Sequence, residues 1–301
     1  CTFHYFGISD ISLIDDRLSK TKKISERDFN QLTGDQRVRH IIEKAEFYGY
    51  SGERVKGLIF CSRIDESKIL SEKFNQLVNP ATGKYFRTIA LNGDASDEQR
   101  QEAFERLAMN EEDGTSDREP LDYIFSVEIL NEGVDIVEVN QVIMLRPTQS
   151  PIVFIQQLGR GLRKAEGKEY VVILDFIGNY NNNFMIPIAL SGDQTYNPDN
   201  IRRYVISGNM TIPGASSIHF DEIAKEKIFT SIDKIKGMPT IIRESYLTLK
   251  NRLGRVPYLL DFYENGEIDP LVIIREYKTY QKFLEIVEKD SYVGRISEQD
   301  L

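Results

Sequence analysis

The sequence has few of the residues that a metal-centred, disulfide-linked or membrane-spanning protein needs. Its 301 residues include two cysteines and no tryptophan, and the three histidines lie far apart, at His4, His40 and His219. No CxxC pair is present, so neither a structural zinc nor any other metal site is expected. Cys61 ends an apolar run and is expected to be a buried, inert thiol. No apolar run approaches the roughly 20 residues that cross a bilayer, and we expect a cytoplasmic protein.

An excess of positive charge is also absent. The chain has 47 acidic and 38 basic residues, which gives a net charge of −9. This balance excludes a protein coated with basic residues, so any nucleic-acid site must be local. The chain begins with Cys1, without an initiator methionine or a basic leader, and we interpret it as a piece of a longer protein.

Five apolar runs alternate with stretches that have helical periodicity. Continuous apolar runs of this length are typical of strands that a parallel sheet buries on both faces. We therefore predict an α/β domain with a RecA-like, doubly wound parallel sheet. The predicted strands are 55–61, 85–92, 121–126, 140–145 and 169–176.

The two flanks differ in composition from this α/β region. Residues 1–50 are expected to be a charged connector, residues 51–190 the α/β domain, and residues 191–301 a second, mainly helical domain. In the last part, Gly254 is expected to end one helix, and Asp269 followed by Pro270 to begin another. Asp269 with Glu276 and Lys278 also matches a D…ExK nuclease pattern, but we favour the helix because apolar residues recur there at helical spacing.

The stretch "QQLGRGLRK" (156–164) places two arginines, Arg160 and Arg163, three residues apart beside glycines. It follows the fourth predicted strand, at the carboxyl edge where open α/β sheets bind ligands. Paired guanidinium groups there suit phosphate oxygens, which they bind in a planar, bidentate way. For an isolated GRxxR, an ordinary solvated helix face is the alternative interpretation.

Four segments in order resemble the motifs of superfamily 2 helicases of the DEAD/DEAH type. "QQLGRGLR" resembles motif VI, "FSVEILNEGVDI" (125–136) motif V, and "GLIFCSR" (57–63) motif IV. "LNGDASDEQRQEAFERL" (91–107) resembles the segment after motif IV, with Asn92 in place of the more common histidine. Together they cover residues 55–176 and resemble the second of the two RecA-like motor domains. The resemblance implies an ATP-dependent helicase.

The resemblance also implies residue roles on the nucleotide side. Arg160 and Arg163 match the arginine fingers that reach the γ-phosphate of ATP bound to the first motor domain, and Gln156 matches a residue that helps close the interdomain cleft. Further residues of motifs V and VI match positions next to the nucleotide: Gly133, Asp135 and Gly159.

On the nucleic-acid side, the resemblance assigns contacts with phosphates to Ser62, Arg63, Gly93 and Ser126. Glycine at such a position lets a backbone N–H approach a phosphate with no Cβ in the way. Gln157 departs from the arginine often found second in motif VI. The expected partner is nucleic acid, DNA rather than RNA.

The residues that hold ATP and Mg²⁺ in such enzymes are missing. No GxxxxGK[ST] is present; the closest stretch, Gly161 to Gly167 followed by Lys168 and Glu169, has the wrong spacing and no hydroxyl for magnesium. We therefore expect ATP and Mg²⁺ to be bound mainly by an upstream RecA-like domain of the same polypeptide. The chain alone is expected to be inactive as an ATP hydrolase.

Longer stretches, including "CTFHYFGISD" and "IPGASSIHFDEI", resemble bacterial helicases related to the type III restriction (Res) subunit. Two alternatives stay open at this point. The domain could instead be a non-catalytic docking module for nucleic acid or protein. In the last part of the chain, "RVPYLLDFYENG" (255–266) could touch nucleic acid or form a packed core with a solvated rim.

Overall fold

A computed structural model describes most of the chain. The described residues are 2–10, 30, 32–115, 117–127, 137–146, 164–178, 183–193, 196–207, 216–233, 237–264 and 268–288. Among the described helices, none is long and apolar enough to cross a membrane.

Seven parallel strands form one sheet, in the order β3-β4-β2-β5-β6-β1-β7. The five strands predicted from apolar runs are all present, which confirms the α/β parallel fold. Because every strand runs in the same direction, all carboxyl ends meet at one edge of the sheet. The strands are β1 (Thr2–Ser9), β2 (Gly57–Phe60), β3 (Thr88–Leu91), β4 (Tyr123–Ser126), β5 (Gln141–Met144), β6 (Tyr170–Ile177) and β7 (Ser217–Phe220).

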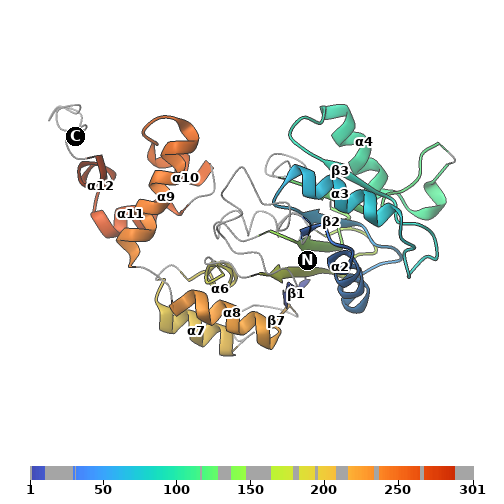
Figure 1. Ribbon diagram of the computed structural model, residues 1–301, viewed down its shortest axis with the longest axis horizontal. Coiled ribbons are helices and arrows are strands. Elements are labelled where there is room, and N and C mark those ends of the chain that lie inside the picture. Colours follow the sequence, from blue (N-terminus) through green and yellow to red (C-terminus); the bar gives the residue numbers. More distant parts are fainter. Residues whose placement is uncertain are drawn as a thin grey trace.

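Helices cover both faces of the sheet, as a doubly wound fold requires (Figure 1). On one face, α2 (Asp35–Tyr48) and α3 (Ile64–Asn75) bury their apolar sides against the strands. On the other face lie α4 (Asp97–Ala108) and, beyond it along the sheet, three further helices. These are α6 (Met185–Ser191), α7 (Pro198–Ser207) and α8 (Glu222–Asp233).

Local sequence signals set where several of these helices begin. Ser96 caps α4: its hydroxyl accepts a hydrogen bond from the Gln99 N–H, and the Gln99 side chain accepts one from the Ser96 N–H. This reciprocal capping box satisfies two N–H groups that have no partner within the helix. A short 3₁₀ turn (Glu111–Asp113) follows α4 before the chain enters β4.

The sheet extends beyond the predicted boundaries on both sides. Thr2–Ser9, assigned from sequence to the connector, forms β1 and pairs with β6 along its whole length. Ser217–Phe220, assigned to the second domain, forms β7 on the other side of β1. The absence of a side chain at Gly7 lets β7 lie close to β1, because a Cβ on Gly7 would be only 2.4 Å from the Phe220 ring. The aromatic and β-branched residues of β1 are typical of a strand, but the charged residues that follow it led to its assignment to the connector.

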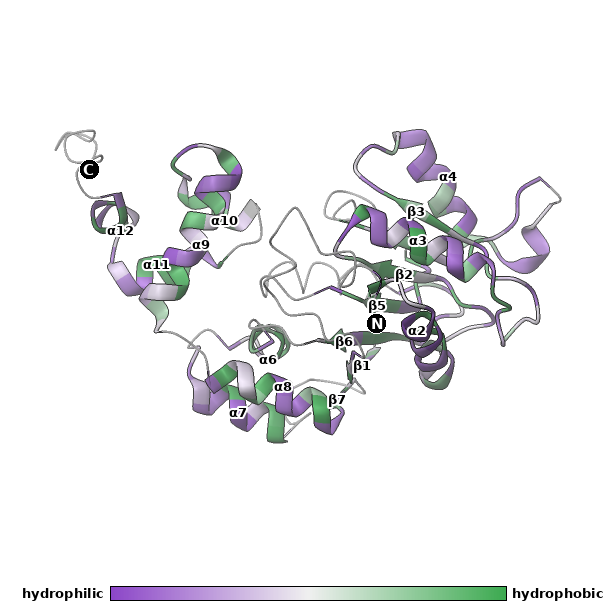
Figure 2. Ribbon diagram, viewed as in Figure 1, coloured by the Kyte–Doolittle hydropathy of each residue, from purple (hydrophilic) through white to green (hydrophobic). Residues whose placement is uncertain are grey.

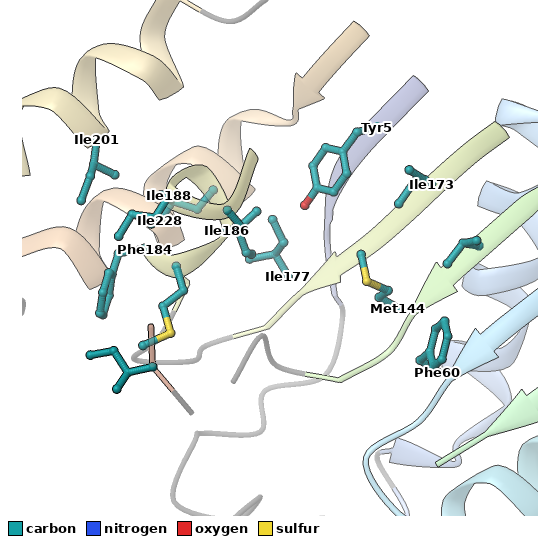
Figure 3. Packing of buried hydrophobic residues seen from close by; sticks show 14 of the residues in the cluster. Tyr5, Phe60, Met144, Ile173, Ile177, Phe184, Ile186, Ile188, Ile201 and Ile228 are labelled. Atoms are coloured by element: carbon teal, nitrogen blue, oxygen red, sulfur yellow. The ribbon is translucent and has the colours of Figure 1, made fainter. Parts of the chain in front are cut away.

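The core beneath this part of the sheet contains one buried polar pair. The Tyr5 hydroxyl donates a 2.6 Å hydrogen bond to the Asp175 carboxylate, and both side chains are buried. Apolar residues of α6 and of the neighbouring strands surround the Tyr5 ring (Figure 3). Burial raises the pKa of Asp175 to about 7, although the bond from Tyr5 opposes this shift. Asp175 is therefore a carboxyl group that is neutral in mildly acidic solution.

Four helices at the end of the chain pack around aromatic rings. They are α9 (Met238–Leu253), α10 (Leu259–Glu264), α11 (Pro270–Tyr277) and α12 (Tyr280–Glu288). They lie to one side of the sheet (Figure 1), and Tyr246, Phe262 and Phe283 are fully buried among them. Figure 2 shows that polar residues alternate with apolar ones along these helices. The mainly helical C-terminal part is confirmed.

Both predicted helix ends in this part are also confirmed. Gly254 ends α9 in the left-handed conformation, with φ of 66°. Asp269 caps α11 by accepting a 2.9 Å hydrogen bond from the Leu271 N–H. The carboxylate of the D…ExK pattern thus serves as a helix cap.

Candidate functional site

The predicted site residues fall into two groups. The motif V and VI residues lie outside the described residues: Gly133, Asp135, Gln156, Gly159, Arg160 and Arg163. The structure describes the four residues assigned to nucleic-acid phosphates. Ser62 follows β2, Gly93 follows β3 and Ser126 ends β4, and these three strands are neighbours in the sheet. Their side chains and backbone groups therefore meet at one carboxyl edge.

Ser126 has the feature most typical of a binding group. The residue is 1% exposed, yet its hydroxyl has no hydrogen-bond partner within the described part of the chain. Its carbonyl accepts a 2.9 Å bond from the Cys61 N–H, which ties the end of β4 to the end of β2. Cys61 itself is buried, and burial raises the pKa of its thiol well above the ordinary value. A buried hydroxyl without a partner is rare in proteins and requires a reason.

Ser62 and Arg63 are held by carboxylates of α3. The Ser62 N–H donates a 3.0 Å bond to Glu66 Oε2, so the backbone of Ser62 is fixed while its hydroxyl remains available. The Arg63 guanidinium donates two bonds, of 2.9 and 3.0 Å, to the Asp65 carboxylate. This hydrogen-bonded pair raises the pKa of Arg63. The pair engages two of the five N–H groups of the guanidinium, so the others can still donate to a phosphate.

Asn92 and Asp94, the neighbours of Gly93 in the chain, line an open hollow of about 410 Å³ between α3, β3 and α4. A Cβ built on Gly93 would have no heavy atom within 4 Å, so the space above this residue is open. The Gly93 carbonyl accepts a 3.1 Å bond from Arg100 Nη2, which orients the loop. The hollow contains both cationic and acidic side chains, among them Lys68, Asp94, Glu102 and Arg106.

A buried ionic network that no sequence motif indicated supports this edge. Arg37 of α2 is 1% exposed and binds the Asp10 carboxylate with Nε and Nη2, at 3.1 and 2.8 Å. Its Nη1 binds Glu66 Oε1 at 2.9 Å and the Leu32 carbonyl at 2.8 Å. Burial raises the pKa of Glu66, and the charge of Arg37 opposes that shift. We call Asp10, Arg37 and Glu66 the carboxyl-edge network.

This network connects elements that carry the site. Asp10 follows β1, Arg37 lies in α2, and Glu66 lies in α3 and fixes Ser62. No pattern in the sequence could reveal it, since the two carboxylates lie 27 and 29 residues from Arg37. The available signal was that Arg37 lies at helical spacing with the apolar residues Ile41 and Ala45 of α2.

A second ionic network lies at the opposite edge of the sheet. Asp122, just before β4, accepts bonds from Arg54 and from both the backbone and the side chain of Arg87. Arg87 also pairs with Glu111, and this pair lowers the pKa of Glu111 to about 2. We call Arg54, Arg87, Glu111 and Asp122 the amino-edge network. Arg54, Arg87 and Asp122 precede β2, β3 and β4, whereas the predicted site residues lie at the opposite ends of these strands.

Comparison with known protein families identifies the part of the chain that contains β2 to β5. Residues 37–165 match the model of the helicase conserved C-terminal domain. This part of the chain is a helicase C-terminal domain. The match begins at Arg37 of the carboxyl-edge network and includes Ser62, Gly93 and Ser126, the described residues at the carboxyl edge. Residues 242–300, which include α10, α11 and α12, match a domain of unknown function (DUF8090).

Two curated relatives are similar to parts of this chain. IRC3 of Saccharomyces cerevisiae, assigned as an ATP-dependent helicase, is 42% identical over 50 residues, which is 17% of this chain. MJ1505 of Methanocaldococcus jannaschii, assigned as an ATP-dependent RNA helicase, is 31% identical over 102 residues, which is 33% of this chain. The chain spans 7% and 12% of the length of these two relatives.

Among solved structures, the ATP-dependent type ISP restriction-modification enzyme LlaBIII bound to DNA is similar over 98% of this chain and 23% of its own. The sequence identity is 18% and the TM-score 0.47.

Proposed function

We propose that this chain supplies the second motor domain of an ATP-dependent nucleic-acid helicase or translocase. The observation that carries the proposal is the helicase C-terminal domain whose described binding candidates, Ser62, Gly93 and Ser126, follow three neighbouring parallel strands at one edge. We further propose that the protein is bacterial, cytoplasmic and related to the Res subunit of type III restriction enzymes. The substrate class proposed is DNA rather than RNA.

The described residues are suited to binding phosphates without recognising the base sequence. Ser126 offers a hydroxyl with no competing acceptor in the described part of the chain. Gly93 offers a backbone position with open space above it, and Ser62 offers a hydroxyl on a backbone that Glu66 fixes. Hydroxyl and backbone N–H groups are common phosphate contacts, and they set position rather than sequence preference.

On the nucleotide side, we propose that Arg160 and Arg163 act as arginine fingers and that Gln156 helps close the cleft between the two motor domains. Gly133, Asp135 and Gly159 are proposed to lie beside the nucleotide. ATP and Mg²⁺ would be held mainly by an upstream domain, where the metal neutralises phosphate oxygens. Arginine fingers raise phosphoryl-transfer rates by about 10³ to 10⁵, or roughly 4 to 7 kcal/mol of barrier.

The experiment that tests this function compares two polypeptides. One is the present chain, and the other is the same chain extended upstream to include an ATP-binding motor domain. We expect nucleic-acid-stimulated ATP hydrolysis from the extended protein and none from the chain alone. If the extended protein does not hydrolyse ATP with either DNA or RNA, the result would contradict the proposed motor function and favour a non-catalytic docking module.

A further inference from the structure

The edge strand β3 leaves part of its backbone without a partner. Strand β3 ends the sheet and, within the described residues, pairs only with β4. The N–H and C=O groups of Thr88 point away from β4, since they bind the side chain of Asn75 at 2.8 and 3.1 Å. Because backbone groups of successive strand residues alternate in direction, the N–H and C=O groups of Ala90 also point outward. The sheet therefore offers no partner to these two groups.

The open part of this edge borders the hollow of about 410 Å³ between α3, β3 and α4, which we call the β3 hollow. Helices α3 and α4 lie on opposite faces of the sheet (Figure 1), so a hollow lined by both must lie beside the edge of β3. Its lining includes three alanines, whose small side chains leave space beside the strand. They are Ala90, Ala95 and Ala103. An added strand would lie about 4.8 Å from β3, within this space.

The chemistry of the β3 hollow favours a peptide over a nucleic acid. Ala90 offers one donor and one acceptor, and an extended peptide carries the complementary acceptor and donor on its own backbone. Phosphate oxygens accept hydrogen bonds, so a phosphate would leave the Ala90 carbonyl without a donor. The lining contains two cations and two carboxylates, and thus no excess charge that would select a polyanion. These side chains are Lys68, Arg106, Asp94 and Glu102.

The same edge is closed immediately before the β3 hollow. Proteins usually protect edge strands from pairing with other chains. Asn75 protects Thr88 in this way, because its amide both donates to the carbonyl and accepts from the N–H, as a neighbouring strand would. In the part of the chain that the structure describes, no side chain does the same for Ala90. A pairing strand is thus excluded at Thr88 and admitted at Ala90.

We propose that the β3 hollow binds an extended peptide segment of a partner protein, which pairs with Ala90 as an added strand of the sheet. Backbone hydrogen bonds at a sheet edge give affinity, and the pockets beside the edge select side chains. A helical segment would not suit this edge, because its backbone groups are already paired within the helix. The site goes beyond the proposed motor function, since its lining includes none of the residues assigned to ATP or to phosphates.

Amide hydrogen exchange, measured by NMR on the labelled chain, tests the pairing directly. The probes are peptides selected on this chain from a random-peptide phage library. In the free chain, the Ala90 amide should exchange faster than the Ile89 amide, which points toward β4. A saturating peptide should slow exchange at Ala90 about tenfold or more relative to Ile89. If no selected peptide slows exchange at Ala90, the proposal is overturned.

Two substitutions on the same edge separate pairing from folding. Ala90→Pro removes the N–H that the peptide would bind, and an edge strand tolerates proline where its N–H faces outward. Anisotropy titrations should show peptide affinity about tenfold lower or more, a difference of about 1.4 kcal/mol. The matched control is Asn75→Ala, which opens the edge at Thr88 and should bind the same peptide at least as tightly as the parent. Equal affinities of Ala90→Pro and parent would contradict the pairing.

A modified peptide gives the same test on the unaltered chain. N-methylation of alternate peptide residues removes the donors that could reach the Ala90 carbonyl. The peptide methylated in the register that faces β3 should bind about tenfold more weakly than the one methylated in the other register. Equal binding of the two peptides would overturn the proposal.

Other occupants of the β3 hollow give different results in these measurements. If the free chain sediments as a dimer and already protects the Ala90 amide, the edge pairs with a second copy of the chain. If oligo(dT) slows exchange at Ala90 as much as the peptide does, the hollow holds nucleic acid. Either result would overturn the proposal. An inactive extended motor with intact peptide pairing would overturn only the proposed motor function.

Discussion

At the scale of single residues, Ser126 combines burial with an unused hydroxyl. Such a group makes no hydrogen bond that stabilises the described part of the chain, and we propose that it binds a ligand. Ser126→Ala should therefore leave the free energy of unfolding within about 0.5 kcal/mol of the parent. The same substitution should weaken oligonucleotide binding about tenfold or more, since a hydrogen bond to a charged group contributes roughly 1.5–3 kcal/mol.

Ser231 provides the matched control for Ser126. It is also buried, but its hydroxyl donates a 2.7 Å bond to the Ile228 carbonyl within α8. Ser231→Ala should lower stability by about 1 kcal/mol and leave oligonucleotide affinity unchanged. Chemical denaturation and anisotropy measure the two quantities. If Ser126→Ala behaves like Ser231→Ala, the hydroxyl of Ser126 has no binding role.

Asp175 makes stability depend on pH. Its pKa is about 7 in the folded chain against an ordinary value of 3.8, so between these values the folded state holds one more proton than the unfolded state. The free energy of unfolding should then fall as pH rises from about 4 to 7. Above about pH 7 the titration of Asp175 should no longer change it. Asp175→Asn removes the titration, while its amide oxygen can still accept the bond from Tyr5.

The measurement for Asp175 is urea denaturation from pH 4.5 to 8. The slope of the free energy of unfolding against pH should differ between parent and Asp175→Asn by at most the equivalent of one proton, about 1.4 kcal/mol per pH unit. Tyr5→Phe is the control, since loss of its hydrogen bond should raise the pKa of Asp175 and move the decline to higher pH. Identical slopes for parent and Asp175→Asn would show that Asp175 titrates normally.

At the scale of elements, the carboxyl-edge network sets how β1, α2 and α3 meet. Arg37→Met leaves two buried carboxylates, Asp10 and Glu66, without their cation. Breaking a buried pair in this way typically costs about 3–5 kcal/mol, and we expect that loss in the free energy of unfolding. We also expect weaker nucleic-acid binding, because Glu66 no longer fixes the Ser62 backbone.

The exposed ion pairs of Arg118 serve as the comparison. Arg118 pairs with Glu102 and Glu105 of α4 at the surface. Arg118→Met should cost less than about 1 kcal/mol, as is usual for exposed pairs. Denaturation curves of both variants decide the matter: equal losses would mean that the carboxyl-edge network contributes no more than surface pairs.

Elements marked by continuous apolar runs or by capping residues could be predicted from the sequence, whereas ionic contacts between distant residues could not. Apolar runs marked β2 to β6, Ser96 and Asp269 marked helix starts, and Gly254 marked a helix end. Strand β1 was missed because the charged residues after it placed all of 1–50 in a connector; distant pairing is not the reason, since β2 also pairs with strands far along the chain. The Arg37 contacts were hidden because burial and ion pairing depend on the whole fold.

At the scale of the whole molecule, the chain combines a parallel sheet, whose carboxyl edge we propose to bind nucleic-acid phosphates, with a helical C-terminal part. In the proposed motor, hydrolysis coupled to closure of the two motor domains would move the bound strand.

The most direct measurement is the ATP hydrolysis rate of the extended protein with saturating nucleic acid, for parent, Arg160→Ala and Arg163→Ala. Arg202→Ala is the control at an exposed arginine of α7 that pairs with Asp199 and Asp233. We predict that each motif VI substitution lowers the rate by about 10³ or more, while Arg202→Ala leaves it unchanged. Rates within a few-fold of the parent for both motif VI variants would contradict the account.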